Sequence, residues 1–102
     1  MTSPNHPGNY GSNYQKTETL RAAQGEVLIL QFTAFDLEPD DFCDFDYLRI
    51  TDGDGTILMG NKCGNSLPPN VISKTNVVNV HFKTDATGQG SGWSITWHAE
   101  YM

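Results

Sequence analysis

Carboxylate side chains are concentrated in one stretch of this sequence. Eight of the 12 acidic residues lie between positions 36 and 54, namely Asp36, Glu38, Asp40, Asp41, Asp44, Asp46, Asp52 and Asp54. Like charges a few ångströms apart repel one another unless a cation neutralises them. Ca²⁺ suits this role because its coordination by oxygen ligands is flexible enough for loop carboxylates. The cluster therefore indicates a calcium site, and the alternative is a solvated acidic loop that keeps a small domain soluble.

The aspartates at positions 52 and 54 precede a glycine, as they would in an EF-hand calcium loop. If Gly55 is aligned with the glycine of the 12-residue EF-hand loop, the first ligand position is Ile50 and the twelfth is Asn61. The EF-hand needs a bidentate glutamate at the twelfth position. The EF-hand interpretation therefore fails. We expect instead that residues 52–55 form a hairpin turn between two strands.

Enzymatic chemistry finds no support in the sequence. A G-x-S-x-G nucleophile elbow is absent, because Gln89 stands where Ser91 would need its first glycine. His6, His81 and His98 are isolated, and the last two fall on the polar faces of expected strands. A chain of 102 residues also has little room for a deep catalytic cleft. We therefore expect that the chain is not an enzyme.

The charge balance limits the classes of partner. The chain carries 6 basic and 12 acidic side chains, for a net charge of -6, and the basic residues are scattered singly. Such a chain repels a phosphate backbone, so a basic protein is a better partner than nucleic acid or an anionic membrane. No apolar run approaches the roughly 18 residues of a membrane span, so we expect no membrane insertion. The N-terminus lacks the features of a signal peptide, so we expect either a removed segment or a piece of a larger protein.

Alternation of apolar residues with period two predicts an all-β fold without helices. The expected strands are residues 26–32, 47–51, 77–83 and 93–101. The last of these places Trp93, Ile95, Trp97, Ala99 and Tyr101 on one face. We expect both tryptophans to fill the core, although exposed tryptophans could instead stack on a glycan. Frequent turn signals between the strands predict an antiparallel β-sandwich of jelly-roll type, with residues 1–102 in a single domain.

The two cysteines, Cys43 and Cys63, allow one internal disulfide. Neither lies in a C-x-x-C pair, so redox and zinc sites lack their usual spacing. Closing a loop of about 20 residues stabilises a fold by roughly 3 kcal/mol in the loop-entropy model, which matters for a small core. We expect the disulfide to form, and it implies an oxidising compartment.

Several segments resemble the CUB domain in order along nearly the whole chain. They are residues 3–10 (SPNHPGNY), 35–38 (FDLE), 43–48 (CDFDYL), 63–64 (CG), 67–68 (LP) and 82–85 (FKTD) through 92–93 (GW). The resemblance implies an extracellular jelly-roll sandwich in which Cys43 and Cys63 form the second of the family's two disulfides. The first pair is absent, with Leu20 and its neighbours where its second cysteine would fall, and His6 replaces the usual tyrosine. This pattern is similar to the two-cysteine N-terminal CUB domains of complement-initiating proteases.

The resemblance also implies a calcium site and a mode of binding. In calcium-binding CUB domains, the positions matched by Glu38, Asp46 and Asp85 supply carboxylates, and the position matched by Thr87 supplies a backbone carbonyl. The position matched by Tyr10 orients the carboxylates. The ordered loops then capture a lysine or arginine of a partner protein.

For this chain, the expected contacts to the partner are Tyr10, Glu38, Asp85 and Thr87, while Asp46 mainly holds calcium. We expect Asp40, Asp41 and Asp44 to be rim charges that steer the approach of a basic partner. One such contact is weak, so multivalency through the parent protein is expected. The alternatives are a calcium-dependent carbohydrate-binding module and a structural spacer, ancillary to an extracellular protease.

Overall fold

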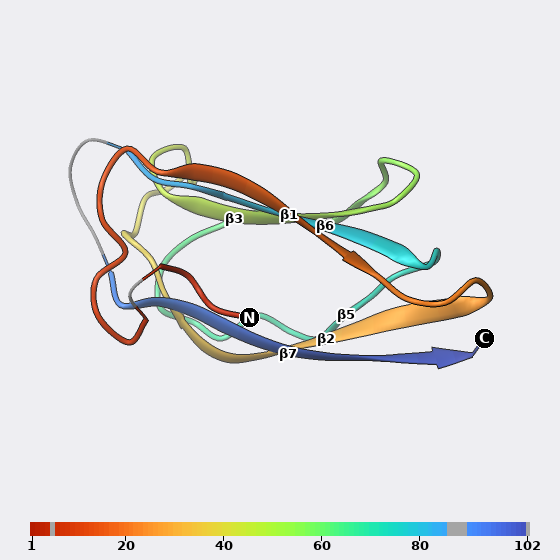
Figure 1. The fold of residues 1–102 in the computed structure, drawn as a ribbon. Helices are drawn as coiled ribbons and strands as arrows, with labels where there is room; N and C mark the ends of the chain where they lie inside the picture. The colour runs from red at the N-terminus through yellow and green to blue at the C-terminus, as the bar shows by residue number, and fades with distance from the viewer. Residues whose placement is uncertain (5, 86–89, 102) are drawn as a thin grey trace.

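The computed structural model describes residues 1–4, 6–85 and 90–101, which form two antiparallel sheets packed face to face (Figure 1). The strands are β1 (Gln15–Arg21), β2 (Glu26–Asp36), β3 (Tyr47–Asp52), β4 (Ile57–Lys62), β5 (Val71–Ile72), β6 (Val77–Lys83) and β7 (Gly92–Tyr101). One sheet has the order β1-β6-β3-β4 and the other the order β5-β2-β7. The expected antiparallel β-sandwich is therefore confirmed. No helix in the described ranges is long and apolar enough to cross a membrane.

The core lies between the two sheets and is built from the inward positions of the alternating strands. Leu28 and Leu30 of β2 and Leu48 and Ile50 of β3 are fully buried. The remaining buried apolar side chains of this cluster are Tyr10, Phe32, Phe35, Leu37, Val71, Val78, Val80, Phe82, Trp93 and Ile95. Full burial of one such side chain contributes about 1.5–3 kcal/mol relative to exposure, so these strands hold the sandwich together.

The four predicted strands correspond to β2, β3, β6 and β7, but three further strands were not predicted. β2 continues to Asp36, past a register shift between Phe32 and Ala34. β1 and β4 are the outer strands of their sheet, and β5 has two residues. An outer strand buries less of each face than a central one, so apolar and polar residues alternate less regularly in its sequence. In β1, for example, Leu20 is the only large apolar residue, and it is half-buried.

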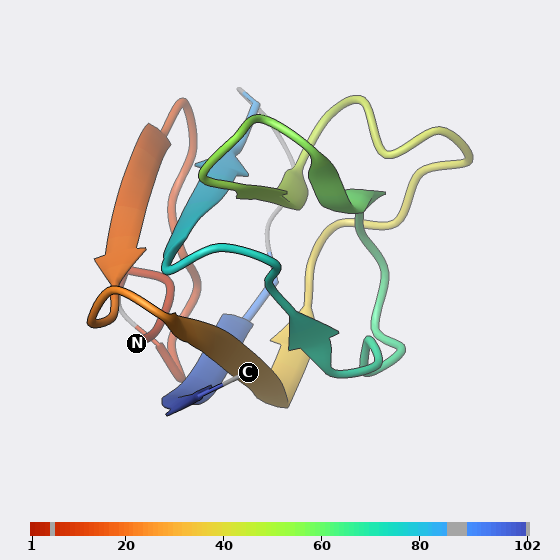
Figure 2. The ribbon, with the colours of Figure 1, turned by 90° about the vertical axis from the view of Figure 1, so that its right-hand side faces the viewer.

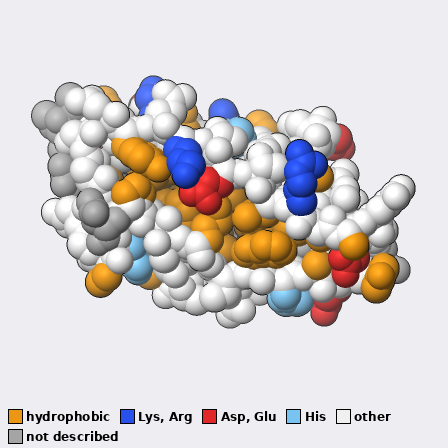
Figure 3. Space-filling view, viewed as in Figure 1, with side chains coloured by type: hydrophobic (Ala, Val, Ile, Leu, Met, Phe, Trp, Pro, Cys, Tyr) orange, Lys and Arg blue, Asp and Glu red, His pale blue; other side chains and the backbone are white. Residues whose placement is uncertain are grey.

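The second half of β7 departs from the sequence prediction. Trp93 and Ile95 are buried as expected, but Trp97 is 39% exposed and Tyr101 is 77% exposed. The prediction of a core position was therefore wrong for Trp97, and Tyr101 on the same face is exposed as well. Among the described residues, β7 is the outermost strand of its sheet, and no strand lies beside its second half on one side. Figure 3 shows hydrophobic side chains exposed in a band between the two sheets on the side where β1 and β7 lie.

Candidate metal centre

Loops at one end of the sandwich bring three of the predicted ligands together. Glu38 lies just after β2, Asp46 directly precedes β3, and Asp85 lies just after β6. β3 and β6 are antiparallel neighbours with Tyr47 opposite Lys83, so the start of β3 and the end of β6 lie at the same end of the sheet. One carboxylate oxygen from each of the three acidic residues lies within 4.8 Å of the other two.

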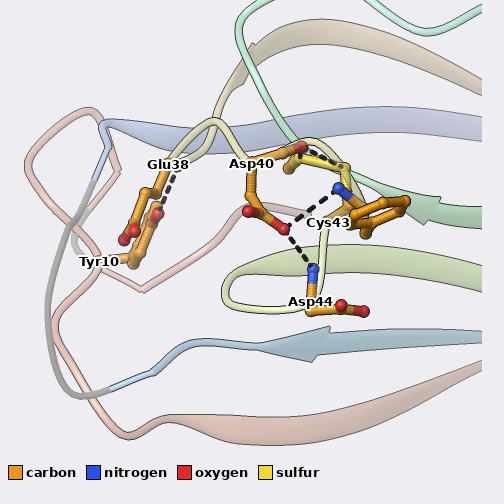
Figure 4. Close-up of a disulfide and its surroundings, with 7 residues drawn as sticks. Tyr10, Glu38, Asp40, Cys43 and Asp44 are labelled. Atoms are coloured by element: carbon orange, nitrogen blue, oxygen red, sulfur yellow. Dashed lines mark hydrogen bonds between the residues drawn. A yellow bond between two sulfur atoms is a disulfide. The ribbon is translucent and has the colours of Figure 1, made fainter.

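Asp46 is the buried centre of this group. Its side chain is 0% exposed. Its Oδ1 accepts the backbone N–H of Asp85 at 2.8 Å, and its Oδ2 accepts the hydroxyl of Tyr10. The Tyr10 hydroxyl in turn accepts the backbone N–H of Glu38 at 3.1 Å (Figure 4). Tyr10 therefore links the segments that carry all three carboxylates.

Tyr10 is held by the core and by a backbone hydrogen bond to Gly90. Its side chain is 2% exposed, and its ring packs edge-on against Phe82 with centroids 5.2 Å apart. Its backbone N–H donates to the carbonyl of Gly90. Burial and the hydrogen bond to Asp46 raise the pKa of Tyr10, so the hydroxyl stays a donor. These contacts place the Tyr10 hydroxyl between Asp46 and the backbone of Glu38, while its burial leaves little surface for the predicted contact to a partner.

The electrostatics of the cluster favour a bound cation. Burial raises the pKa of Glu38, and the negative charges of Asp85, Asp46 and Asp40 raise it further. Burial also raises the pKa of Asp46, despite the hydrogen bonds that it accepts from Tyr10 and the Asp85 amide. The Glu38 Oε2 atom is buried and has no hydrogen-bond partner among the described residues. A buried, unpartnered carboxylate oxygen is costly unless a cation neutralises it, so these residues fit Ca²⁺.

The predicted disulfide ties the loop between Glu38 and Asp46 to the segment that follows β4. Cys43 and Cys63 are bonded, with their Cα atoms 5.4 Å apart. Within the loop, the Asp40 carboxylate accepts the backbone N–H of Phe42 at 3.2 Å and that of Asp44 at 3.1 Å (Figure 4). Asp40 therefore shapes the loop as well as adding charge to its rim. Asp41 and Asp44 are exposed, as expected of rim charges.

Asp36 has a structural role that the sequence analysis missed. Its Oδ2 accepts the backbone N–H of Ser91 at 3.1 Å and the Ser91 hydroxyl at 3.0 Å. The backbone at Gly90 packs so closely on that of Asp36 that a Cβ on Gly90 would lie 2.1 Å from the Asp36 carbonyl oxygen. Only glycine fits at that position. The repeated glycines are the sequence feature that could have indicated this close approach.

The acidic stretch divides into two groups that lie at opposite ends of β3. Asp52 ends β3 and is fully buried, whereas Asp46 precedes the strand. At roughly 3.4 Å per residue, the strand separates them by about 20 Å. Asp52 and Asp54 belong to the turn between β3 and β4, which confirms the predicted hairpin, and they take no part in the calcium cluster. Thr87, the predicted carbonyl ligand, lies outside the described residues.

Two residues of the loop were not singled out from the sequence. Phe42 is 79% exposed and Phe45 is 49% exposed, and both lie between the ligand positions Glu38 and Asp46. Exposed aromatic rings beside charged groups are common at the centres of protein interfaces. The FDLE and CDFDYL segments indicate the carboxylates, but neither segment indicates that the rings are exposed.

The candidate residues His81 and Trp93 form no second site among the described parts of the chain. His81 is not simply exposed, because its two ring nitrogens are 2.9 Å and 3.0 Å from the hydroxyls of Thr17 and Thr51. Burial lowers its pKa, and the charge of Arg49 lowers it further. Trp93 is 3% exposed and so cannot stack on a glycan.

Comparison with known proteins agrees with this geometry. A family model described as "CUB domain" matches residues 1–97. Homo sapiens cubilin is 35% identical over 104 residues, which cover 100% of this chain and 3% of cubilin. The solved MASP-1 CUB2 domain bound to Ca²⁺ is 28% identical with a TM-score of 0.87, covering 96% of this chain and 88% of that chain. The full extracellular region of zebrafish Gpr126/Adgrg6 is 25% identical with a TM-score of 0.91, and the match covers 100% of this chain and 13% of that chain.

Proposed function

The chain belongs to the CUB domain family, and on that premise we propose that it is a calcium-dependent module that captures a lysine or arginine of an extracellular partner protein. CUB domains are non-catalytic, and this one is extracellular like the regions in which its relatives occur. The proposal rests on the convergence of the carboxylates of Glu38, Asp46 and Asp85. One of their oxygens, Oε2 of Glu38, is buried and has no hydrogen-bond partner among the described residues.

We propose that Glu38, Asp46 and Asp85 hold the ion, with the carbonyl of Thr87 as a further ligand. Bound Ca²⁺ supplies positive charge that offsets the repulsion among the carboxylates and fixes the loops that carry them. Asp46 suits a purely metal-holding role because both of its oxygens already accept hydrogen bonds inside the protein. The Ca²⁺-bound MASP-1 CUB2 domain, which matches nearly the whole chain, supports this assignment.

Glu38 and Asp85 are the proposed acceptors for the partner's cation. Both are half-buried, so part of each side chain still faces solvent. An ammonium or guanidinium group held between preorganised carboxylates gains charge-assisted hydrogen bonds, which are roughly twice as strong as neutral ones. Tyr10 orients this pair from beneath through the Glu38 amide and Asp46. Because such attraction is screened by salt, affinity for the partner should fall as ionic strength rises.

Phe42 and Phe45 give the same surface an apolar component. Both rings are exposed in the loop that runs from Glu38 to Asp46. The long stem of lysine or arginine can pack on such a ring, and its charged end is attracted to the ring face. We propose that these rings add contact area around the ionic contact.

The first test is a calcium titration of chelator-treated protein by calorimetry, with thermal unfolding in parallel. We expect one saturable site and a raised melting temperature, because a ligand that binds only the native state stabilises it. At a hundredfold excess over the dissociation constant, the gain is about 2.7 kcal/mol, or a shift of the order of 10 °C for a domain of this size. Absence of binding at millimolar calcium would refute the proposal.

A second test separates steering charges from ligands. Replacing Asp41 and Asp44 by asparagine should lower the association rate with a lysine-presenting surface such as immobilised polylysine, because both side chains are exposed rim charges. Calcium affinity and the dissociation rate should stay unchanged. Asp54→Asn is the matched control, since it removes an exposed charge at the opposite end of β3. A faster dissociation or a loss of calcium binding in the double variant would argue that these residues contact the partner or the ion directly.

We also propose that the domain is one module of a longer extracellular protein. The chain spans 3% of cubilin and 13% of the Gpr126 region, so these relatives are much longer than this chain. A single ionic contact is weak, and several linked modules would raise the overall avidity.

A further inference from the structure

Half of the basic residues gather on the outer face of the β1-β6-β3-β4 sheet, which is the face that looks away from the second sheet. Alternate residues of β3 and β6 are buried in the core, so the residues between them point outward. Arg49 and Lys83 are among these outward residues, and Arg21 joins them because it pairs with Val77. The three strands β1, β6 and β3 lie side by side in one layer (Figures 1 and 2). Strand pairing therefore collects cations that the sequence scatters singly.

These three cations are not neutralised within the described part of the domain. None of the outward positions of β1, β3 and β6 is an aspartate or a glutamate. Arg21, Arg49 and Lys83 form no ion pair with a described residue, and the buried Nε of Arg49 has no hydrogen-bond partner there. Lys16, by contrast, lies on the inward side of β1 and pairs with Glu18 at 3.7 Å. In the view of Figure 3, the visible Lys and Arg side chains lie over the sheet that contains β1.

Polar side chains between the cations are held in place by hydrogen bonds across the strands. The ring of His81 on β6 bridges the hydroxyls of Thr17 on β1 and Thr51 on β3, at 2.9 Å and 3.0 Å. The Thr19 hydroxyl donates to Oδ1 of Asn79 at 2.8 Å, which leaves the amide N–H groups of Asn79 without a partner among the described residues. The face therefore presents fixed hydroxyl and amide groups between its positive charges.

A groove of about 460 Å³ hollows the face at its Arg21 end. Thr19 and Asn79 line it from the strands, Asn76 lines it from the turn before β6, and Asp54 lines it from the turn between β3 and β4. The volume lies within the range of small-molecule sites. Hydroxyl and amide groups of this kind can both donate hydrogen bonds to sugar hydroxyls and accept them.

We propose that this outer face binds a sulfated glycan chain, with sulfate groups held by Arg49, Lys83 and Arg21 and sugar hydroxyls held by the polar side chains between them. Hydrogen bonds from guanidinium and ammonium groups to anion oxygens are charge-assisted and therefore strong. Arg49 opposes His81, so Arg49 and Lys83 are diagonal neighbours with about 7–8 Å between them. Arg21 lies about 20 Å further along the strands, so an extended chain can contact all three cations.

The chemistry of the face favours a glycan over an acidic protein. A protein interface has an apolar or aromatic centre, and only Tyr47 and Val77 offer apolar surface among the outward residues of these three strands. The domain is also extracellular, like the regions in which its relatives occur, and sulfated glycans are abundant polyanions outside the cell.

The net charge of -6 opposes binding of a polyanion, but few of the carboxylates border this face. Attraction and repulsion between exposed charges decay over a Debye length of about 8 Å at physiological ionic strength. Asp85 follows Lys83 by two residues, and Asp54 lines the groove beside Arg21. Asp54→Asn should therefore raise affinity for the glycan by roughly threefold.

Calorimetric titration with a heparin oligosaccharide tests the proposal, in chelator and again in calcium. We expect binding in both conditions and none to fully desulfated heparin. The logarithm of the binding constant should fall with the logarithm of salt concentration with a slope between about -2 and -3, because each of three cations displaces about one counterion. Binding in chelator keeps this result separate from the proposed calcium site. Absence of binding at low salt, or polyglutamate bound as tightly as heparin, overturns the proposal.

Three variants test the assignment of residues. Arg49→Gln and Arg21→Gln should each weaken heparin binding by about tenfold, because each removes a charged donor on the outer face. Lys16→Gln is the matched control, since it removes the same charge from β1 on its inward side and should leave the affinity nearly unchanged. Retained calcium binding and melting temperature show that each variant folds. An equal loss in Lys16→Gln, or no loss in a folded Arg21→Gln and Arg49→Gln double variant, overturns the proposal.

Discussion

Replacing Asp46 by alanine should abolish calcium binding at physiological calcium levels, and with it the calcium-dependent rise in melting temperature. Asp46 is fully buried and is tied to Tyr10 and to the amide of Asp85. The change removes one carboxylate ligand, and it also frees the two donors that align Glu38 and Asp85. We expect the calcium dissociation constant to rise by about two orders of magnitude, as loss of a ligand together with its orienting contacts implies. Calorimetric titration of both proteins measures this change.

Asp46→Asn and Asp44→Ala are the informative controls for that result. The amide introduced by Asp46→Asn keeps an oxygen that can accept the Asp85 N–H but carries no charge, so this variant separates charge from loop geometry. Asp44 lies in the same loop but is exposed, and its loss should leave calcium affinity nearly unchanged. Unchanged calcium affinity in Asp46→Ala would remove Asp46 from the ligand set. Binding of a lysine-presenting surface should fall in parallel with calcium affinity, because the same residue orders both.

The three carboxylates of the cluster were predictable from the sequence, while the contacts that align them were not. Glu38, Asp46 and Asp85 stand in segments that resemble a known calcium-binding pattern, and the structure brings them within reach of one ion. The tie of Asp36 to Ser91, by contrast, joins residues 55 positions apart. Such a contact depends on how the sheets pack, and alternation within a strand carries no information about it.

The fold shows the same division between local and long-range information. Alternation identified the strands whose inward residues are buried, such as Leu48 and Ile50 of β3. It failed for β1 and for the second half of β7, since both lie at sheet edges. Trp97 has the alternation of a core residue and the inward orientation of one, yet its strand has no neighbour there among the described residues. Whether such a face is covered depends on what lies beside the strand.

Asp52→Ala should be among the most destabilising substitutions in the chain, although it lies far from the calcium site. The Asp52 side chain is fully buried. Its Oδ2 accepts the Lys74 N–H at 2.7 Å, and its Oδ1 accepts the Gly53 N–H and both the N–H and hydroxyl of Thr75. Removing the carboxylate leaves these donors without that partner. We expect a loss of about 3–4 kcal/mol in the free energy of unfolding, measured by urea denaturation.

The pH dependence of stability provides an independent check on Asp52. Burial alone would raise its pKa, but the hydrogen bonds from Thr75, Lys74 and Gly53 outweigh burial and lower it. A carboxyl group whose folded pKa lies below its unfolded value of about 3.9 stabilises the fold above that pH, and loses this contribution as pH falls through the folded pKa. The difference in unfolding free energy between wild type and Asp52→Asn should therefore be constant near pH 7 and shrink below about pH 4. A difference that does not change between pH 7 and pH 3 would show that the Asp52 charge contributes nothing, and that the side chain acts only through its shape. Calcium binding should persist in Asp52→Asn wherever the protein is folded, because the two acidic groups lie at opposite ends of β3.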